Sequence, residues 1–299
     1  MYNFTVIIPH KNTPDLLQRC LDSIPQRNDL QVIIVDDNSD KSAVDFDAFP
    51  GLNRENTEIV FSKGKKGKGP GFARNVGLAK AKGEWIIFSD ADDYFTTSFN
   101  DLLEQYKQAQ EEIIFFKCSR QNENEAVYDY ALINDAIDTA IKTGNSDNIV
   151  YGIPCPWGKF IKRDFIEKNK ICYQEITGGD DILFSVQMAV KLKDYAFSEE
   201  RIYCVVDRQG SLTRNTQWKG FYSYSKACCD AYVLMLPVGR KEMAVIWLSS
   251  WWGFLWAENK WIAISLVPYI IRKLKIADAV QAIRKGIKRG AWNWRNENK

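Results

Sequence analysis

Three carboxylates, those of Asp90, Asp92 and Asp93, stand together directly after the apolar segment Trp85–Phe88. At a strand end they repel one another unless a cation or hydrogen-bond donors neutralise them. Hard divalent ions prefer such oxygen ligands and leave coordination positions for phosphate oxygens. The pattern therefore predicts a site for a metal ion and a phosphate. The alternative is a solvated acidic turn that caps the next helix.

A second acidic pair, Asp36 and Asp37, follows the apolar segment Val32–Val35. A carboxylate at a strand end can accept hydrogen bonds from a nucleotide, as acidic residues do in dinucleotide sites. The plainer interpretation is a turn with a helix cap. The pair is thus a candidate for binding a base or a ribose.

Glycines and lysines dominate residues 64–71, but their spacing matches neither the P-loop nor the dinucleotide-binding fingerprint. A nucleoside triphosphatase or a dehydrogenase is therefore disfavoured. The segment precedes an expected helix, and Arg74 lies in the first turn of that helix. A cation beside a helix N-terminus suits a diphosphate, whereas the individual lysines are typical of a surface loop.

Asp180 and Asp181 follow two glycines, Gly178 and Gly179, at the start of an amphipathic segment. A positioned carboxylate can take the proton from a hydroxyl group as that group attacks an electrophile. The pair is therefore a candidate general base. The same residues are also typical of a helix N-cap.

The segments that must position these residues alternate between short apolar runs and amphipathic stretches. This alternation predicts strand–helix–strand units, an α/β fold and a largely parallel sheet. Ligands of open α/β sheets bind outside the carboxyl ends of strands, so the acidic loops should converge on one crevice. Strands are expected at Phe4–Ile8, Val32–Val35, Glu58–Phe61, Trp85–Phe88, 113–117 and 202–206, and helices from Pro14, near 72–82, 99–109 and 131–143, and at 180–191.

The composition is that of a globular chain, because 45% of its 299 residues are hydrophobic and 26% are charged. Seven cysteines form no CxxC pair, so reduced thiols are expected. Zinc binding is disfavoured because His10 is the single histidine. The first residues are typical of a core strand rather than of a signal peptide, and we expect a cytoplasmic protein.

Five motifs occur in the order found in bacterial family 2 glycosyltransferases, and the chain resembles that family over about residues 3–213. The resemblance implies a GT-A-type mixed, mostly parallel sheet flanked by helices. It also implies a nucleoside-diphosphate-sugar donor, expected to be UDP-linked, a Mn2+ or Mg2+ ion, and inversion at the anomeric carbon. The motifs are Pro9–Asn12, Val35–Ser39, Ala73–Gly77, Asp90–Asp93 and Gly179–Phe184.

Carried over to this sequence, the family pattern implies donor-binding roles for four residues. Pro9 begins the loop that lines the base and the ribose. Asp37 corresponds to the base-binding carboxylate, with Asp36 beside it, and Arg74 resembles the arginine of the donor site. His10 departs from the pattern, because the family commonly has tyrosine or valine there.

The resemblance assigns Asp90 and Asp92 to the first and last acids of the DxD motif. Asp92 is the expected direct metal ligand, and Asp90 is its ribose-side partner. Asp93 follows the motif and is expected to position the acceptor or the donor sugar. Asp181 corresponds to the catalytic base that deprotonates the acceptor hydroxyl. Asp180 stands where glutamate is usual, so its carboxylate is one methylene shorter.

A constrained loop is expected at Pro154–Lys159. Within it, Trp157 and Lys159 resemble the tryptophan-and-lysine segment that often precedes the base in this family. Arg208 begins residues 208–213, which resemble a late loop that closes near the diphosphate. These three residues are expected to support the acceptor or the donor.

An enzyme of this family would move a sugar to a hydroxyl of a glycan or a lipid-linked acceptor, as in surface polysaccharide synthesis. The expected catalytic domain spans 1–213, with a nucleotide-binding half at 1–95 and an acceptor half at 96–213. Two alternatives stay open. A sugar nucleotidyltransferase would normally carry a glycine-rich loop after the first strand, where Pro9–Asn12 stands. A non-catalytic nucleotide-sugar-binding module would use the acids only as caps.

The expected third part of the chain is a basic, tryptophan-rich helical extension over 214–299. It holds 15 Lys/Arg and 5 Asp/Glu, whereas residues 1–213 hold 25 and 33. Neither apolar run, Met243–Trp256 or Trp261–Ile271, reaches the roughly 18 residues of a spanning helix. The helices either pack on the catalytic domain or contact an anionic membrane through 243–289. The second interpretation places the protein at the inner face of the cytoplasmic membrane, and no recognised motif supports a nucleic-acid partner.

Overall fold

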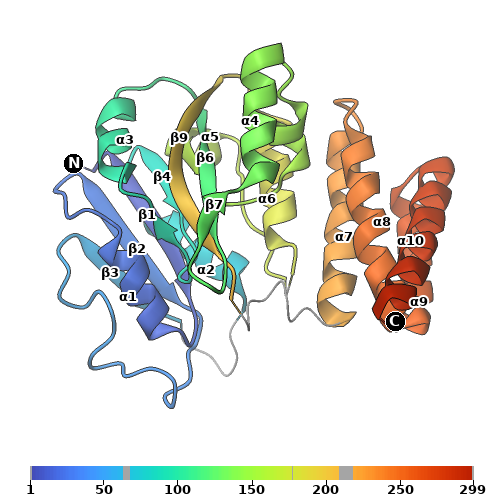
Figure 1. Ribbon diagram of the computed structural model, residues 1–299, viewed down its shortest axis with the longest axis horizontal. Helices are drawn as coiled ribbons and strands as arrows, with labels where there is room; N and C mark the ends of the chain where they lie inside the picture. Colours follow the sequence, from blue (N-terminus) through green and yellow to red (C-terminus); the bar gives the residue numbers. More distant parts are fainter. Residues whose placement is uncertain (1, 63–67, 177, 209–217, 298–299) are drawn as a thin grey trace. The chain divides into compact units, whose positions relative to one another are not determined.

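The computed structural model describes residues 2–62, 68–176, 178–208 and 218–297 of the chain (Figure 1). The chain forms two compact units, one from residues 1–175 and 191–209, the other from 176–190 and 210–299. The segment 176–190 thus belongs with the C-terminal helices, although the chain returns to the first unit after it. The expected division at residue 213 falls within 209–217, outside the described residues, and stays a prediction.

A mixed, mostly parallel sheet forms the first unit. Its strands are β1 (Phe4–His10), β2 (Leu30–Asp36), β3 (Thr57–Phe61), β4 (Trp85–Phe88), β5 (Tyr94–Phe95), β6 (Ile113–Gln121), β7 (Val127–Asp129), β8 (Lys159–Lys162) and β9 (Tyr195–Val206). They lie in the order β3-β2-β1-β4-β8-β6-β9-β5, with β7 paired to β6. The first four in this order are parallel to one another, as are β6 and β9. Strand β8 is antiparallel to both β4 and β6 and joins the two parallel parts.

The central strands are buried on both faces, as continuous apolar runs of a parallel sheet should be. All seven residues of β2 and all four of β4 are buried. A buried polar pair interrupts the run: Thr5 donates its hydroxyl to Oε1 of Gln31 at 2.9 Å and accepts from the N–H of Gly83 at 2.8 Å. The buried Thr5 hydroxyl thus both donates and accepts a hydrogen bond, as a buried polar group requires.

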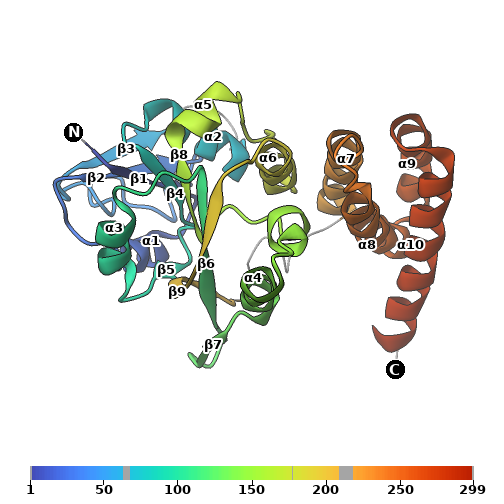
Figure 2. The ribbon, with the colours of Figure 1, turned by 90° about the horizontal axis from the view of Figure 1, so that it is seen from above.

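Helices cover both faces of this sheet. Figure 2 shows α1 (Pro14–Asp22) and α3 (Phe99–Tyr106) on one side, and α2 (Pro70–Lys80) and α5 (Arg163–Lys168) on the other. Helix α4 (Ala131–Thr143) contacts β6 and β9, and a short π-helical turn, η1, follows at Asn148–Gly152. The expected strands and helices of this unit are all present, with some ends shifted. The short elements β5, β7, β8 and α5 were not expected, and β8 begins at Lys159, inside the expected loop.

The second unit is helical. It contains α6 (Asp180–Ala189), α7 (Trp218–Met235), α8 (Lys241–Glu258), α9 (Lys260–Lys273) and α10 (Ile276–Glu297). Trp252 is buried and donates its indole N–H to the carbonyl of Ala263 at 3.1 Å, and Trp251 stacks on Tyr224 with ring centroids 4.0 Å apart. The tryptophans of α8 therefore help to fill the helical unit itself. Among the described residues, no helix combines the length and apolarity that crossing a bilayer requires.

Candidate active site

The expected donor-site residues of the first unit lie at one edge of the sheet, where β1, β2 and β4 end. His10 is in register with Asp36, and the N–H of Asp37 donates to the carbonyl of His10 at 2.8 Å. The N–H of Ser89 donates to the carbonyl of Ile7 at 3.1 Å, so the loop after β4 starts beside β1. The parallel strands thus bring the two acidic loops to one edge, as the sequence predicts.

The carboxylate of Asp36 is bonded inward. It accepts from Nδ1–H of His10 at 2.9 Å and from the N–H of Ser39 at 2.9 Å. Nε2 of His10 accepts from the N–H of Thr13 at 3.2 Å, which assigns the proton to Nδ1. Burial opposes the charge of Asp36, but the bonds from His10 and Ser39 outweigh it and lower the pKa. Asp36 therefore shapes the loop, and its expected contact with the nucleotide, like that of Pro9, stays a prediction.

Asp37 holds the start of α2. Its Oδ1 accepts from the N–H of Lys68 at 2.7 Å and its Oδ2 from the N–H of Gly69 at 2.9 Å. Gly69 is the N-cap of α2 and has φ +95°, a conformation that favours glycine. Lys11 lies 4.0 Å from the same carboxylate. Residues 64–67 of the expected glycine-rich loop lie outside the described residues.

Arg74 connects α2 to the loop after β4. Its Nη2–H donates to Oδ1 of Asp90 at 2.6 Å, and its guanidinium lies 5.3 Å from the ring centre of Tyr173. Burial raises the pKa of the Asp90 carboxyl, while the charge of Arg74 opposes this shift and Asp92 adds to it. Gly69 and Arg74 are five residues apart, which is about 7.5 Å along a helix axis. The amino end of α2 thus lies between two acidic loops.

Asp92 is paired with a second arginine. Nε–H of Arg208 donates to Oδ2 of Asp92 at 2.8 Å, and both side chains are partly exposed. Arg19, on α1, donates to the backbone carbonyl of Asp92. The expected late-loop residue Arg208 therefore lies at the expected metal ligand. The rest of that loop, residues 209–213, lies outside the described residues.

Asp93 is buried and bonded to β9. It accepts from the hydroxyl of Tyr203 at 2.9 Å and from the N–H of Val206 at 2.8 Å. The N–H of Asp90 donates to the same Tyr203 oxygen at 2.8 Å. Burial, with the neighbouring charges of Asp90 and Asp92, raises the pKa of Asp93 well above its ordinary value. Asp93 fixes the loop to the sheet, and its expected contact with a sugar stays a prediction.

Trp157 contacts Tyr203, and Lys159 follows two residues later in the chain. The ring of Trp157 stacks on Tyr203 with centroids 5.4 Å apart, and Tyr130 lies 5.8 Å away. Lys159 is buried, and its Nζ donates to the carbonyl of Cys155 at 2.5 Å. An aromatic side chain that remains partly exposed suits the apolar face of a sugar. The position of Trp157 is compatible with acceptor binding, whereas Lys159 braces the loop.

Asp180 and Asp181 belong to the helical unit, at the first turn of α6. Asp180 is buried, and Asp181 is the more exposed of the two. The N-cap, Gly179, has φ +80° and packs against the ring of Tyr224. Burial raises the pKa of Tyr224 and the charge of Asp181 adds to the shift, so this phenol lies near the expected base. Carboxylates at a helix N-terminus are stabilised by the helix dipole.

The packing of Gly179 gives a test of how this turn is held. A Cβ at Gly179 would lie 2.8 Å from Cδ1 of Tyr224, whereas a Cβ at Gly239, with φ +73°, would meet nothing within 4 Å. We expect Gly239→Ala to cost about 1–2 kcal/mol through backbone strain alone. Gly179→Ala should cost about 1–3 kcal/mol more, because it adds overpacking. Urea unfolding measures both, and equal costs would show that Tyr224 does not brace the turn.

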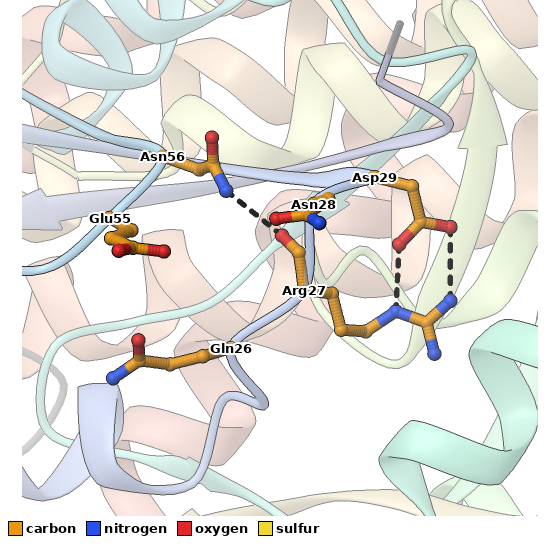
Figure 3. A pocket seen from close by; sticks show the side chains of 6 residues that line it. All are labelled: Gln26, Arg27, Asn28, Asp29, Glu55 and Asn56. Carbon is orange, nitrogen blue, oxygen red and sulfur yellow. Dashed lines mark hydrogen bonds and ion pairs between the residues drawn. The ribbon is translucent and has the colours of Figure 1, made fainter.

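A separate hollow of about 340 Å³ lies elsewhere on the first unit (Figure 3). Residues 26–29, Glu55 and Asn56 line it. Arg27 and Asp29 form two hydrogen bonds there, of 2.8 and 3.0 Å. These residues precede β2 and β3, so the hollow lies at the amino ends of the strands. Ligands of such sheets bind at the carboxyl ends, and the hollow is therefore a poor candidate for the donor site.

The carboxylates can be tested for their fit to a divalent ion. Within the described residues, no three or more His, Cys, Asp or Glu side chains are grouped as a metal site. Among the described residues, Arg74 bonds Oδ1 of Asp90 and Arg208 bonds Oδ2 of Asp92, so one oxygen of each carboxylate stays available to another ligand. Mg2+ is commonly bound by one or two carboxylates with substrate phosphates and water. The residues therefore fit an ion that is shared with a bound diphosphate.

Two residues that contact the acidic loop 90–93 were not expected from the sequence. Tyr203 joins the backbone of Asp90 to Asp93, and Arg19 bonds the backbone of Asp92. A tyrosine within the apolar strand 202–206 was the available signal, because a buried hydroxyl requires a partner. Arg19 gives no such signal, since a cation in the last turn of α1 is also typical of a helix end.

The matched part of the sequence decides the family. Residues 5–169, more than half of the chain, match the profile of Glycosyl transferase family 2. The chain belongs to this family. This membership confirms the family resemblance that the five motifs predict. The acidic loops after β2 and β4 therefore belong to a glycosyltransferase domain.

Relatives of known name are bacterial glycosyltransferases. A poly(ribitol-phosphate) beta-glucosyltransferase of Bacillus spizizenii is 29% identical over 216 residues, which are 69% of this chain and 32% of that protein. The beta-N-acetylglucosaminyltransferase TarP of Staphylococcus aureus, which also acts on poly(ribitol-phosphate), is 26% identical over 213 residues, 69% of this chain and 63% of TarP. This glycosyltransferase chain thus spans between about a third and just under two thirds of these relatives.

Solved structures show the same fold. Residues 1–349 of S. aureus TarS, crystallised with UDP-GlcNAc, give a TM-score of 0.74 at 18% identity, covering 99% of this chain and 92% of that one. The mannosyltransferase PcManGT of Pyrobaculum calidifontis, with GDP-Man and Mn2+, gives 0.53 at 16% identity, covering 95% and 87%. At such identities the likeness concerns the fold alone. The GT-A fold expected for this glycosyltransferase is confirmed.

Proposed function

We propose that this glycosyltransferase moves a sugar from a nucleoside-diphosphate-sugar to a hydroxyl group, with inversion at the anomeric carbon. The observation that carries the proposal is the arrangement around α2. Its amino end lies between Asp37 on one side and the Arg74–Asp90 pair on the other, and Asp92 follows with Arg208. Hydrogen-bond donors for a diphosphate and hydrogen-bond acceptors for a nucleoside are thus present at the carboxyl edge of the sheet.

The donor is proposed to lie along this edge. Arg74, Arg208 and the amino end of α2 would neutralise the diphosphate, because cations and free N–H groups favour phosphate oxygens. Asp37 would face the base or the ribose. Its bonds to the N–H groups of Lys68 and Gly69 place the carboxylate at the entrance of α2. UDP is the proposed nucleotide, which is supported by UDP-GlcNAc in the fold relative TarS.

A Mn2+ or Mg2+ ion is proposed to bind at Asp92, with Asp90 as its neighbour. When bound, such an ion would supply positive charge where the leaving diphosphate develops negative charge. The Arg208 side chain would then shift its hydrogen bond from Asp92 to a phosphate oxygen. Both positions keep Arg208 next to an anion, so the exchange leaves its charge paired.

Asp181 is the proposed general base. The acceptor hydroxyl gives its proton to the Asp181 carboxylate as its oxygen bonds to the anomeric carbon. The bond from that carbon to the diphosphate oxygen breaks on the opposite face, and the electron pair leaves with the nucleoside diphosphate. Such a single displacement inverts the anomeric centre.

The acceptor is proposed to be a glycan, an alditol-phosphate polymer or a lipid-linked saccharide of the cell surface. Support comes from the relatives named for transfer to poly(ribitol-phosphate). Trp157 is the candidate to contact the acceptor, since its partly exposed ring stacks on Tyr203 beside Asp93. A sugar or alditol presents both an apolar C–H face and hydroxyls, which suits such a ring next to carboxylates.

A panel of UDP-, GDP- and dTDP-sugars tests the function. We expect one UDP-sugar, with Mn2+ or Mg2+, to raise the melting temperature and to be hydrolysed slowly without an acceptor, because ligands that bind only the native state stabilise it. EDTA should remove both effects. Stabilisation without hydrolysis or transfer would indicate a non-catalytic binding module. Release of pyrophosphate from a nucleoside triphosphate and a sugar phosphate would indicate a nucleotidyltransferase.

A further inference from the structure

Helix α9 carries an apolar stripe on its outer side. Its inner side, with Ala263, Leu266 and Ile270, is buried in the helical unit. The opposite stripe contains Trp261, Ile264, Pro268 and Ile271, whose spacing of three and four residues keeps them on one helix face. The exposed fractions of Trp261, Ile264 and Ile271 are 82%, 46% and 52%. Large apolar side chains thus face away from the core along the whole helix.

Helix α10 repeats the arrangement with charges added. It packs closely on α8, because Gly286 lies against Gly253. Its exposed side has an apolar edge with Ile276, Val280 and Ile287, exposed by 73%, 40% and 38%. A basic edge runs beside it and is formed by Arg284, Lys285 and Lys288, which are all exposed. An apolar edge next to a basic edge is typical of helices that lie in a membrane interface.

The charged residues of α9 and of α10 up to Lys288 are almost all basic. Between Lys260 and Lys288 the sequence has seven Lys or Arg residues and one acid, Asp278. Asp278 is turned inward, where it accepts from Tyr232 at 2.6 Å and pairs with Lys241 at 2.8 Å. The pKa of Asp278 is lowered, chiefly by the bond from Lys241. Between Lys260 and Lys288, the charged side chains that are exposed are therefore all positive.

From these observations we propose that the outer stripes of α9 and α10 form a docking surface for an anionic lipid bilayer. Aromatic and aliphatic side chains would enter the headgroup region, and the cations would contact lipid phosphates. An anionic polymer would neutralise the cations but would leave Trp261 and Ile276 without an apolar environment. A second copy of the chain would oppose like charges. The proposal goes beyond the transfer reaction and does not depend on it.

Vesicle flotation of the full chain tests the surface. Vesicles of phosphatidylcholine mixed with phosphatidylglycerol should bind the chain at low salt, and vesicles of phosphatidylcholine alone should bind it much less. Arg284→Gln/Lys285→Gln/Lys288→Gln should weaken binding about a hundredfold, since each cation near an anionic surface contributes about fivefold. Trp261→Ser should weaken binding about tenfold, because it removes one large inserted side chain. Added salt should reduce binding of the unaltered chain.

Matched variants in the first unit serve as controls. Lys41→Gln/Lys142→Gln/Lys191→Gln removes three exposed cations, and Leu132→Ser removes a side chain that is 57% exposed on α4. Both controls should bind vesicles like the unaltered chain. All substituted side chains are exposed, so thermal unfolding should be unchanged, and a loss of binding can be assigned to the surface.

Three outcomes would overturn the proposal. The first is absence of binding to the anionic vesicles at low salt. The second is equal weakening by the control variants, which would indicate a general charge effect. The third is tight binding to soluble polyphosphate or self-association in sedimentation, with Trp261→Ser affecting these and leaving vesicle binding unchanged. The third result would assign the face to a polymer or to a second copy.

Discussion

Asp181→Asn is expected to reduce the rate of sugar transfer by about a hundredfold to ten-thousandfold, the range in which a general base contributes. Asparagine keeps the shape of the side chain and its place in the first turn of α6, but it cannot accept the acceptor's proton. Binding of the donor should be unchanged, because the proposed donor contacts come from Asp37, Arg74, Asp92 and Arg208. Single-turnover transfer and nucleotide titration measure the two quantities separately.

The control for Asp181→Asn is Glu242→Gln, an exposed acid at the start of α8 in the same unit. It changes the charge of the unit by the same amount and should leave turnover unaltered. The pH profile adds a second readout, since a lost base should remove the acidic limb of kcat. Near-normal turnover by Asp181→Asn would exclude this residue as the base.

Asp92→Ala is expected to be the second large effect, with loss of both turnover and metal-dependent nucleotide binding. A metal ion contributes several kcal/mol of transition-state stabilisation, and each 1.4 kcal/mol is about a tenfold change in rate. Transfer should therefore fall by at least about a hundredfold to a thousandfold. Titration of UDP in the presence and absence of Mn2+ should show that the metal no longer improves binding.

Arg208→Gln distinguishes the proposed metal-binding role of Asp92 from its role as the ion-pair partner of Arg208. It breaks the same 2.8 Å ion pair but keeps the carboxylate. We expect this variant to bind the diphosphate more weakly while Mn2+ still improves its binding. If Asp92→Ala and Arg208→Gln had the same effect and both retained the response to Mn2+, the carboxylate would act only as a partner of Arg208. Asp135→Asn, an exposed acid on α4, is the charge control.

The hydrophobic pattern predicted the parallel half of the sheet closely. Strand β4 begins and ends where the apolar run Trp85–Phe88 does, and β2 extends the expected Val32–Val35 to Leu30–Asp36. Strand β5 was missed because it has only two residues. Strand β8 is as long as β4, but it has a lysine at each end and so gives no apolar run. Their pairing depends on neighbours distant in sequence: β8 on β4 and β6, and β5 on β9. Local pattern cannot carry that information.

The residue types of the candidate site were predictable, but their partners were not. Spacing after strands identified Asp36 and Asp37, yet it gave no sign that one carboxylate would bond inward to His10 and the other to the entrance of α2. Such bonds depend on how the loops cross. The role of Tyr203 was missed for the same reason, because its hydroxyl bonds Asp93 from a strand 110 residues later in the chain.

For the helical extension over 214–299, composition could not predict which way the side chains face. Tryptophan content alone left open whether the apolar side chains face inward or outward. In the structure Trp252 is buried in the helical unit, and Trp261, nine residues later, is the most exposed large apolar side chain described. The difference arises from helix phase, because α9 turns Ala263 and Leu266 to the core and Trp261 away from it.

The proposed donor and metal site is tested most directly by a crystal structure of the chain with UDP and Mn2+, with the metal located by its anomalous scattering. We expect manganese at Asp92 next to the diphosphate, the base beside Asp37, and the Asp181 carboxylate facing the position of the sugar. Manganese and UDP bound elsewhere, with Arg208 still on Asp92, would contradict it. So would an Asp181 side chain that opens onto a different face from the bound diphosphate.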